Sequence, residues 1–252
     1  MNALFDLSGK RALVTGSTRG IGRAIAEAFI AAGAQVVISS EDAADTARAA
    51  AELGQPGLPC DVADDAALTR LLDGTLAALG GLDILVCNAG ITGAPGPFAS
   101  IDMDDYARVM AINLRSQVVL ANLALPHIAA QQNGAVILIS SLSALRGNGQ
   151  INAYALAKAG VSQLARNLAV EWGPRGVRAN AIAPGFIATD LSKPLLENAA
   201  FMARRMAMTP LRRTGTVQEV AGAALFLASA AGGFVTGQTL VVDGGTVITD
   251  GS

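Results

Sequence analysis

Residues 12–22 read ALVTGSTRGIG. The first three residues are apolar, as in a buried strand, and an apolar stripe at helical spacing follows the glycines, from residue 21 to residue 32. Glycines at such a junction let the backbone approach a pyrophosphate, whose charge is met by the free N–H groups of the helix start. The spacing is G-x-x-x-G-x-G rather than G-x-G-x-x-G, so a tight packing loop is the alternative. The stretch predicts a strand, turn and helix that can bind a nucleotide.

The rest of the chain repeats the alternation of short apolar runs and helical patterns. Each run is apolar on both faces, which indicates a parallel sheet covered by helices on both sides. No linker or repeat divides the chain, so a single α/β domain over residues 1–252 is predicted. Residues 186–216 lack a clear period and are expected to form a substrate lid. Seven runs are predicted as strands: 12–14, 36–38, 58–61, 84–86, 136–139, 177–183 and 239–242.

Composition excludes several classes of function. A net charge of -2 and a pI near 5.4 argue against nucleic acid as a partner. The only histidine is His127, so no metal site is expected. Cys60 and Cys87 end apolar runs and are predicted to be buried free thiols in a reducing compartment. No signal peptide or membrane span is recognised, and a cytoplasmic protein with no membrane partner is expected.

Tyr154 and Lys158 are the strongest catalytic candidates. They stand four residues apart in a helical pattern, which puts both side chains on one helical face. An ammonium group close to a phenol favours the phenolate and would lower the tyrosine pKa from about 10. Such a tyrosine can exchange a proton with an alcohol oxygen. The alternative is an ordinary pair on a helix surface.

Several motifs occur together along the chain. They are T-G-x-x-x-G-x-G from Thr15, Asn88-Ala89-Gly90, a serine thirteen residues before Y-x-x-x-K, and Pro184-Gly185. In this order they resemble the classical short-chain dehydrogenases/reductases, over nearly the whole chain from Lys10 to Gly245. The resemblance implies a single Rossmann-type, doubly wound domain with a seven-stranded parallel sheet.

The resemblance also implies a catalytic tetrad of Asn113, Ser141, Tyr154 and Lys158. Tyr154 would be the general acid/base, and Ser141 would hydrogen-bond the substrate oxygen. Lys158 would lower the tyrosine pKa and bind the nicotinamide ribose, and Asn113 would hold a water that links Lys158 to solvent. Strand alternation directs only one of Ser140 and Ser141 toward the site.

A second implication is a binding site for NAD(H) or NADP(H). The Asp61 carboxylate would accept a hydrogen bond from the exocyclic amine of adenine. The usual family motif Asn-Asn-Ala-Gly begins here with Cys87, which removes one hydrogen-bonding side chain. The implied cofactor contacts are Gly16, Ser17, Thr18, Arg19, Gly20, Ile21, Gly22, Ser40, Glu41, Asp61, Val62, Asn88, Ala89, Gly90, Tyr154, Lys158, Pro184, Gly185, Ile187 and Thr189.

Charges after the second predicted strand bear on which cofactor binds. The strand-end position is the neutral Ser40, and Glu41 and Asp42 follow it. Their charges disfavour the 2′-phosphate of NADP, whereas Arg19 in the glycine turn would attract it. These effects oppose each other, and the net negative charge favours NAD(H).

Three functions fit these residues. The first is an NAD(P)-dependent oxidoreductase that interconverts a secondary alcohol and a ketone or aldehyde by hydride transfer, with a small-molecule substrate. The second is a sugar or dihydrodiol dehydrogenase of the same fold. The third is a catalytically silent nucleotide-binding sensor, which would have no need of Tyr154 and Lys158.

Other apolar and charged groups bear on assembly and on the lid. Residues 104–130 and 153–172 are apolar on more than one helical face, which predicts a homotetramer, with a dimer as the alternative. Phe201 and nearby methionines would line the lid or form its core. Arg204 and Arg205 are expected to be solvated or to make subunit contacts rather than to form an anion site, and Arg146, five residues after Ser141, is a further candidate substrate ligand.

Overall fold

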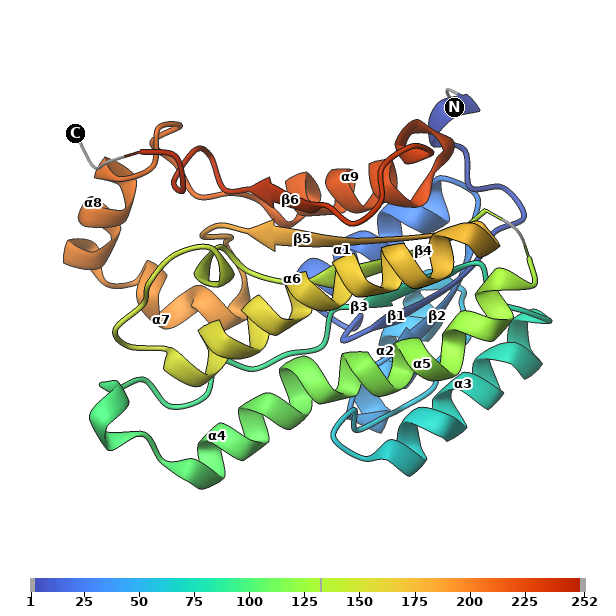
Figure 1. Ribbon diagram of the computed structural model, residues 1–252, viewed down its shortest axis with the longest axis horizontal. Helices are drawn as coiled ribbons and strands as arrows, with labels where there is room; N and C mark the ends of the chain where they lie inside the picture. Colours follow the sequence, from blue (N-terminus) through green and yellow to red (C-terminus); the bar gives the residue numbers. More distant parts are fainter. Residues whose placement is uncertain (1–2, 132, 250–252) are drawn as a thin grey trace.

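A six-stranded, all-parallel sheet organises the chain (Figure 1). The computed structural model describes residues 3–131 and 133–249. The strand order is β2-β1-β3-β4-β5-β6, so the connections run in opposite directions on the two sides of the boundary between β1 and β3. In open α/β sheets ligands bind at the carboxyl ends of strands at such a switch point. The strands are β1 (Arg11–Thr15), β2 (Gln35–Ser39), β3 (Ile84–Cys87), β4 (Gly134–Ile139), β5 (Val177–Pro184) and β6 (Thr239–Val242).

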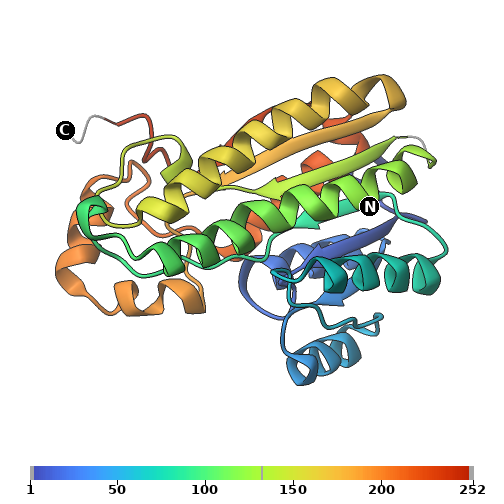
Figure 2. The ribbon, with the colours of Figure 1, turned by 60° about the horizontal axis from the view of Figure 1, so that its bottom comes forward.

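Helices cover both faces of the sheet. On one face α1 packs against α9, and on the other α3, α5 and α6 lie side by side (Figure 2). Each face holds its own cluster of buried apolar side chains, as a sheet apolar on both sides requires. The helices are α1 (Gly20–Ala31), α2 (Ala43–Leu53), α3 (Asp65–Leu79), α4 (Met103–Met110), α5 (Ser116–Ala129), α6 (Asn152–Trp172), α7 (Lys193–Leu196), α8 (Ala199–Ala207) and α9 (Val217–Ala228).

The predicted strand at residues 58–61 is not formed, so the expected count of seven strands is wrong. The segment runs beside β2, where Leu58 N donates to Ile38 O (2.9 Å) and Cys60 N donates to Ser40 O (2.8 Å). The two segments share one isolated bridge, Ile38 with Gly57, and the pairing ends at Cys60 because Asp61 begins a turn in which Asp64 N donates to Asp61 O (3.1 Å). The segment still brings residue 61 to the carboxyl end of the sheet.

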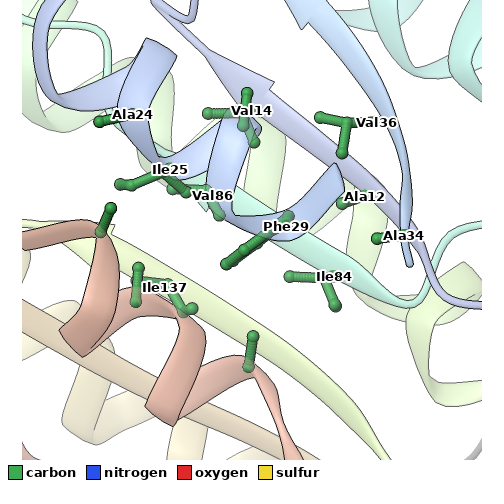
Figure 3. Close-up of a cluster of buried hydrophobic side chains, with 14 of the residues drawn as sticks. Ala12, Val14, Ala24, Ile25, Phe29, Ala34, Val36, Ile84, Val86 and Ile137 are labelled. Carbon is green, nitrogen blue, oxygen red and sulfur yellow. The ribbon is translucent and has the colours of Figure 1, made fainter. Parts of the chain in front are cut away.

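The apolar stripe of α1 anchors this helix on the sheet. Ile25 and Phe29 are fully buried and lie toward Ile84, Val86 and Ile137 of the neighbouring strands (Figure 3). The predicted strand, glycine turn and helix are therefore confirmed, and the packing holds the first turn of α1 above the end of β1.

A continuous helix, Met103–Ala129, crosses the other face of the sheet. Its middle, Ala111–Arg115, is a π-helical turn that joins α4 to α5. The helix is long and apolar enough to cross a membrane by length and composition alone, but 44% of its most apolar window is buried inside the protein. The helix packs against α3 and against β3 and β4, as a core helix of a globular domain does.

The segment after β5 forms α7 and α8 beyond the carboxyl end of the sheet (Figure 1). Its two ends are bonded to each other, because Gly215 N donates to Phe186 O and Ala188 N donates to Gly215 O (both 3.0 Å). The residues between these hydrogen bonds therefore form a loop whose two ends are joined, and this loop lies beyond the carboxyl end of the sheet.

Candidate active site

A cleft of about 480 Å³ opens at the carboxyl ends of the strands. It is lined by the four predicted catalytic residues and by most of the predicted cofactor contacts. The lining side chains come from segments far apart in the sequence, which the parallel sheet brings to one edge. The predicted residues in its wall are Gly16, Thr18, Arg19, Gly20, Ile21, Ser40, Glu41, Asp61, Val62, Asn88, Ala89, Gly90, Asn113, Ser141, Tyr154, Lys158, Pro184, Gly185, Ile187 and Thr189.

The glycine turn is clamped to the end of β3. Asn88 Nδ2 donates to the carbonyl oxygens of Thr15 and Gly16 (both 3.0 Å), and Thr15 Oγ1 accepts from the N–H groups of Asn88 and Ala89. Gly16 has φ +63°, and a Cβ on it would lie 3.0 Å from Ala89 Cα. The turn is therefore close-packed on its inner side.

This turn fits the pyrophosphate of a nicotinamide dinucleotide. Arg19 precedes α1 and makes no side-chain cap, so the first N–H groups of the helix are free to bind an anion. Gly20, the first residue of α1, has φ +57° and leaves its Cβ position open as far as Thr189, 3.8 Å away. The glycine turn therefore offers backbone N–H donors, and no side chain blocks the approach of a phosphate group to them.

Ser17 and Gly22, two of the predicted cofactor contacts, lie behind the cleft wall rather than in its lining. Ser17 is fully buried; its Oγ donates to Val14 O (2.7 Å) and accepts from Ser39 N (2.9 Å). A Cβ on Gly22 would lie 2.2 Å from Gly16 O, so this glycine allows α1 to approach the turn. Both residues support the turn from behind.

The two serines after β4 face opposite ways, as strand alternation predicts. Ser140 is buried; its Oγ donates to Lys158 O (2.8 Å) and shares a hydrogen bond with Ser162 Oγ (2.8 Å). Ser141 Oγ faces the cleft, accepts from Ser143 N (3.1 Å) and is hydrogen-bonded to Tyr154. Ser140 therefore secures α6 to β4, and Ser141 is left for the cleft.

Lys158 holds a buried ammonium group beneath the tyrosine. Its Nζ donates to Ile139 O (2.7 Å) and lies 5.6 Å from the Tyr154 ring centroid. Burial lowers the pKa of Lys158 to about 8, and Cys87 has a smaller opposing effect. Burial raises the pKa of Cys87 to about 12, so this thiol is neutral at pH 7.

Tyr154 differs from the sequence-based expectation. Burial raises its pKa above the ordinary value, and the hydrogen bond with Ser141 acts in the opposite direction. Burial is the largest influence on this pKa, and Lys158 Nζ lies over the ring face, where it donates to Ile139 O. Tyr154 is thus a protonated phenol at neutral pH, which suits a proton donor.

Asn113 lies in the π-helical turn and ties it to the loop after β3. Its Nδ2 donates to Ile91 O (2.8 Å) and Val109 O (2.9 Å), and its Oδ1 accepts from Ile91 N (3.2 Å). A Cβ on Gly90 would lie 2.6 Å from Asn113 Oδ1 and 3.4 Å from Lys158 Nζ. Close approach of these three residues requires glycine at position 90.

Acidic side chains gather at the end of the cleft next to β2. Glu41, Asp42, Asp45 and Asp61 all line it there, and Arg19 is the guanidinium group of the glycine turn. Asp42 Oδ1 caps α2 by accepting from Asp45 N (2.8 Å). Asp61 Oδ1 accepts a hydrogen bond from Ala63 N (2.9 Å) within the turn that Asp61 begins.

The other end of the cleft contains residues of the lid and of the segment after β4. Arg205, expected to be solvated, is half-buried and lines the cleft with Phe186 and Phe201. Its position four residues after Phe201 on one helix was the sequence signal that could have placed both side chains on the same helical face. Further lining residues are Ile91, Thr92, Ser143, Arg146, Asn148, Ile151 and Leu195.

Comparison with known proteins agrees with this geometry. A family described as Enoyl-(Acyl carrier protein) reductase matches residues 16–247. Over 246 residues the chain is 39% identical to the 7alpha-hydroxysteroid dehydrogenase of Escherichia coli K12, covering 96% of this chain and 95% of the relative. The chain belongs to the short-chain dehydrogenase/reductase family.

Two solved structures of this family are close in fold. A gluconate 5-dehydrogenase from Burkholderia cenocepacia J2315, in complex with NADP and tartrate, has a TM-score of 0.94 and 37% identity and covers 98% of both chains. A 7alpha-hydroxysteroid dehydrogenase with NADH and 7-oxo glycochenodeoxycholic acid has a TM-score of 0.91 and 38% identity, with 97% of both chains covered. This short-chain dehydrogenase/reductase is an NAD(P)-dependent oxidoreductase that interconverts an alcohol and a carbonyl compound.

The buried, hydrogen-bonded side chain of Ser17 predicts that its removal costs stability rather than cofactor binding. Ser17→Ala removes the acceptor of the buried Ser39 N–H and should lower the free energy of unfolding by about 1–3 kcal/mol, measured by urea denaturation. The dissociation constant for the cofactor should change by less than about threefold, because the side chain does not reach the cleft. Thr18→Ala, in the cleft wall, is the comparison. Weaker cofactor binding at unchanged stability would contradict this assignment.

Proposed function

We propose that Tyr154 is the general acid/base of this oxidoreductase. The observation that carries the proposal is the phenol of Tyr154 in the cleft, hydrogen-bonded to Ser141 above the buried ammonium group of Lys158. A nicotinamide cofactor, when bound, supplies or accepts the hydride. In ketone reduction Tyr154 gives its proton to the carbonyl oxygen, and in alcohol oxidation it takes that proton back. Ser141 donates a hydrogen bond to the same oxygen and orients it.

Lys158 and Asn113 support this proton transfer. Lys158 uses one N–H on Ile139 O, so its other donors are available for the hydroxyl groups of the nicotinamide ribose. Asn113 is a positioning residue, since its amide bonds hold the loop of Gly90 against Lys158. The water that Asn113 is expected to hold would connect Lys158 with solvent.

The raised pKa of Tyr154 determines which protonation state of the phenol is populated at neutral pH. Because the pKa of Tyr154 is raised, the proton needed for ketone reduction is present throughout the neutral range. Alcohol oxidation needs the phenolate, whose population grows as the pH rises. The rate of alcohol oxidation is therefore expected to rise with pH from neutrality.

We propose NAD(H) as the preferred cofactor. Four carboxylates, those of Glu41, Asp42, Asp45 and Asp61, line the adenosine end of the cleft beside Arg19. Together they disfavour a 2′-phosphate more than one guanidinium group favours it. The two solved relatives differ here, with NADP in one and NADH in the other, so the residues of this chain carry the proposal.

The substrate is proposed to be a secondary alcohol or its ketone. The relatives' names include a hydroxysteroid and a gluconate, and a sugar-type substrate is the second candidate. It fits the polar groups of Ser143 and Asn148 in the cleft wall. Residues 1–252 would act as one dinucleotide-binding and catalytic domain, and residues 186–216 would be the lid over the substrate, with Phe186 and Phe201 in its lining.

A cytoplasmic homotetramer is the proposed assembly. Val118 on α5 and Val170 on α6 are 43% and 80% exposed, although both helices already bury another face against the sheet. A second apolar face on paired helices is typical of subunit contacts in closed symmetric oligomers.

Tyr154→Phe tests the central role. The variant keeps the ring and loses the transferable proton, so kcat for ketone reduction should fall at least about 10²- to 10⁴-fold. Cofactor binding, followed by the fluorescence of the reduced nicotinamide, should persist. Tyr106→Phe, on α4 and outside the cleft lining, is the control and should keep its activity. A Tyr154→Phe enzyme with near-normal turnover would show that another group transfers the proton.

Glu41→Arg tests the cofactor preference. It replaces a repulsive charge by a guanidinium group that can bind a phosphate, so kcat/KM with NADP should rise relative to that with NAD by about tenfold or more. Asp73→Arg makes the same change of charge on α3, away from the cleft. An unchanged ratio in Glu41→Arg would mean that this side chain does not face the ribose.

Light scattering at micromolar concentration tests the assembly. A mass near four times 25.4 kDa is expected, and Val170→Glu should yield smaller species because it places a charge in the contact. A mass of 25.4 kDa for the unaltered protein would exclude the tetramer and the dimer alike.

A further inference from the structure

Two arginines in the cleft wall differ from most others in the protein. Most described arginines donate hydrogen bonds to carboxylate, amide or carbonyl groups, as Arg23 does to Glu27 and Arg178 to Leu227 O. Arg146 and Arg205 line the cleft, and neither forms a hydrogen bond or an ion pair with any residue in the described part of the chain. Their N–H donors are therefore available to a ligand.

The lid holds Arg205 in place without neutralising it. The guanidinium carbon lies 5.6 Å from the Phe186 ring centroid and 5.4 Å from that of Phe201. The two rings are themselves 5.5 Å apart and tilted by 60°. Stacking on aromatic faces restrains the orientation of a guanidinium group but leaves its charge and its donors unused.

The arrangement concentrates positive charge beside the substrate. Burial lowers the pKa of Arg205, and the charges of Arg146 and Arg204 act in the same direction. Like charges held together cost free energy, which a bound anion would recover. The lid carboxylate in the cleft wall, Asp190, forms no ion pair with either arginine among the described residues.

The two arginines stand at the catalytic end of the cleft rather than at its acidic end. Arg146 follows Ser141 by five residues, and Arg205 reaches the cleft from α8 in the lid. The cleft-lining acids Glu41 and Asp61 follow β2 and precede α3, at the adenosine end. A ligand that bridges the arginines would therefore be part of the substrate.

We propose that Arg146 and Arg205 bind a carboxylate of the substrate, so that this enzyme acts on hydroxy acids and the corresponding oxo acids. The proposal rests on the proposed function, since it takes Tyr154 and Ser141 as the place of the reacting oxygen. A carboxylate matches a guanidinium group through two parallel N–H···O bonds. The pair thus selects the acid and fixes its carbonyl group relative to the tyrosine.

Matched acid and ester substrates test the proposal. Reduction of 4-oxopentanoate and 4-oxocyclohexanecarboxylate is compared with reduction of their methyl esters and of cyclohexanone, with each reduced cofactor. The acids should exceed their esters in kcat/KM by about 10- to 100-fold, as expected for a charge-assisted hydrogen bond in a cleft. The advantage should shrink as salt is added.

Arginine variants assign the effect to residues. Arg205→Met and Arg146→Met should each lower the ratio of acid to ester by about tenfold, mainly through KM for the acid. Arg204→Met, an exposed neighbour of Arg205 outside the cleft lining, should leave the ratio unchanged. Arg205→Lys keeps the charge and should retain part of the preference.

The outcomes separate this proposal from the function on which it rests. Equal use of acids and esters, or equal effects of the Arg204 and Arg205 variants, would overturn the carboxylate site and leave the oxidoreductase in place. Absence of reduction for every acid, ester and neutral ketone would instead count against the proposed function and the carboxylate site together.

Discussion

A buried ammonium group is the constraint on which the active site depends. The side chain of Lys158 donates from Nζ to Ile139 O, and the main-chain oxygen of Lys158 accepts from Ser140 Oγ. These two hydrogen bonds connect α6 to the end of β4. Removing a charge from water is costly unless it is hydrogen-bonded, so this position tolerates little movement. The tie fixes Tyr154, one helical turn earlier, next to Ser141. The positions of Tyr154 and Ser141 relative to each other thus depend on the hydrogen bonds of Lys158.

The opposite charges at the two ends of the cleft follow from strand topology. Parallel strands bring the acidic segment after β2 and the arginine-containing segments after β4 and β5 to a single edge. In the proposed function, repulsion from the carboxylates at the adenosine end outweighs Arg19 and disfavours a 2′-phosphate on the cofactor. In the proposed carboxylate site, Arg146 and Arg205 at the other end attract an anionic substrate. Both proposals rest on the charge of the cleft wall, which has opposite signs at the two ends.

Features encoded locally could be predicted from the sequence. The glycine turn, the facing of Ser141 and the helical spacing of Tyr154 and Lys158 depend on a few neighbouring residues, and the structure has each of them. Features that depend on distant packing could not be predicted. The pKa of Tyr154 rises because surrounding segments bury the phenol. The side chain of Ser17 accepts a hydrogen bond from Ser39 N at the end of β2. Arg205 lines the cleft because its guanidinium group stacks on Phe186 and Phe201. The strand expected at residues 58–61 did not form because its pairing with β2 is limited to an isolated bridge and ends at Cys60, before a turn.

The most direct test of a protonated Tyr154 is the pH dependence of kcat for alcohol oxidation at saturating cofactor. Since burial raises the pKa of this phenol, the base form is scarce at neutrality, and kcat should rise by about tenfold per pH unit from pH 6 to about pH 8, where Lys158 begins to lose its charge. A kcat that is constant over this range would contradict the account, because it would mean that the phenolate is already formed at neutral pH.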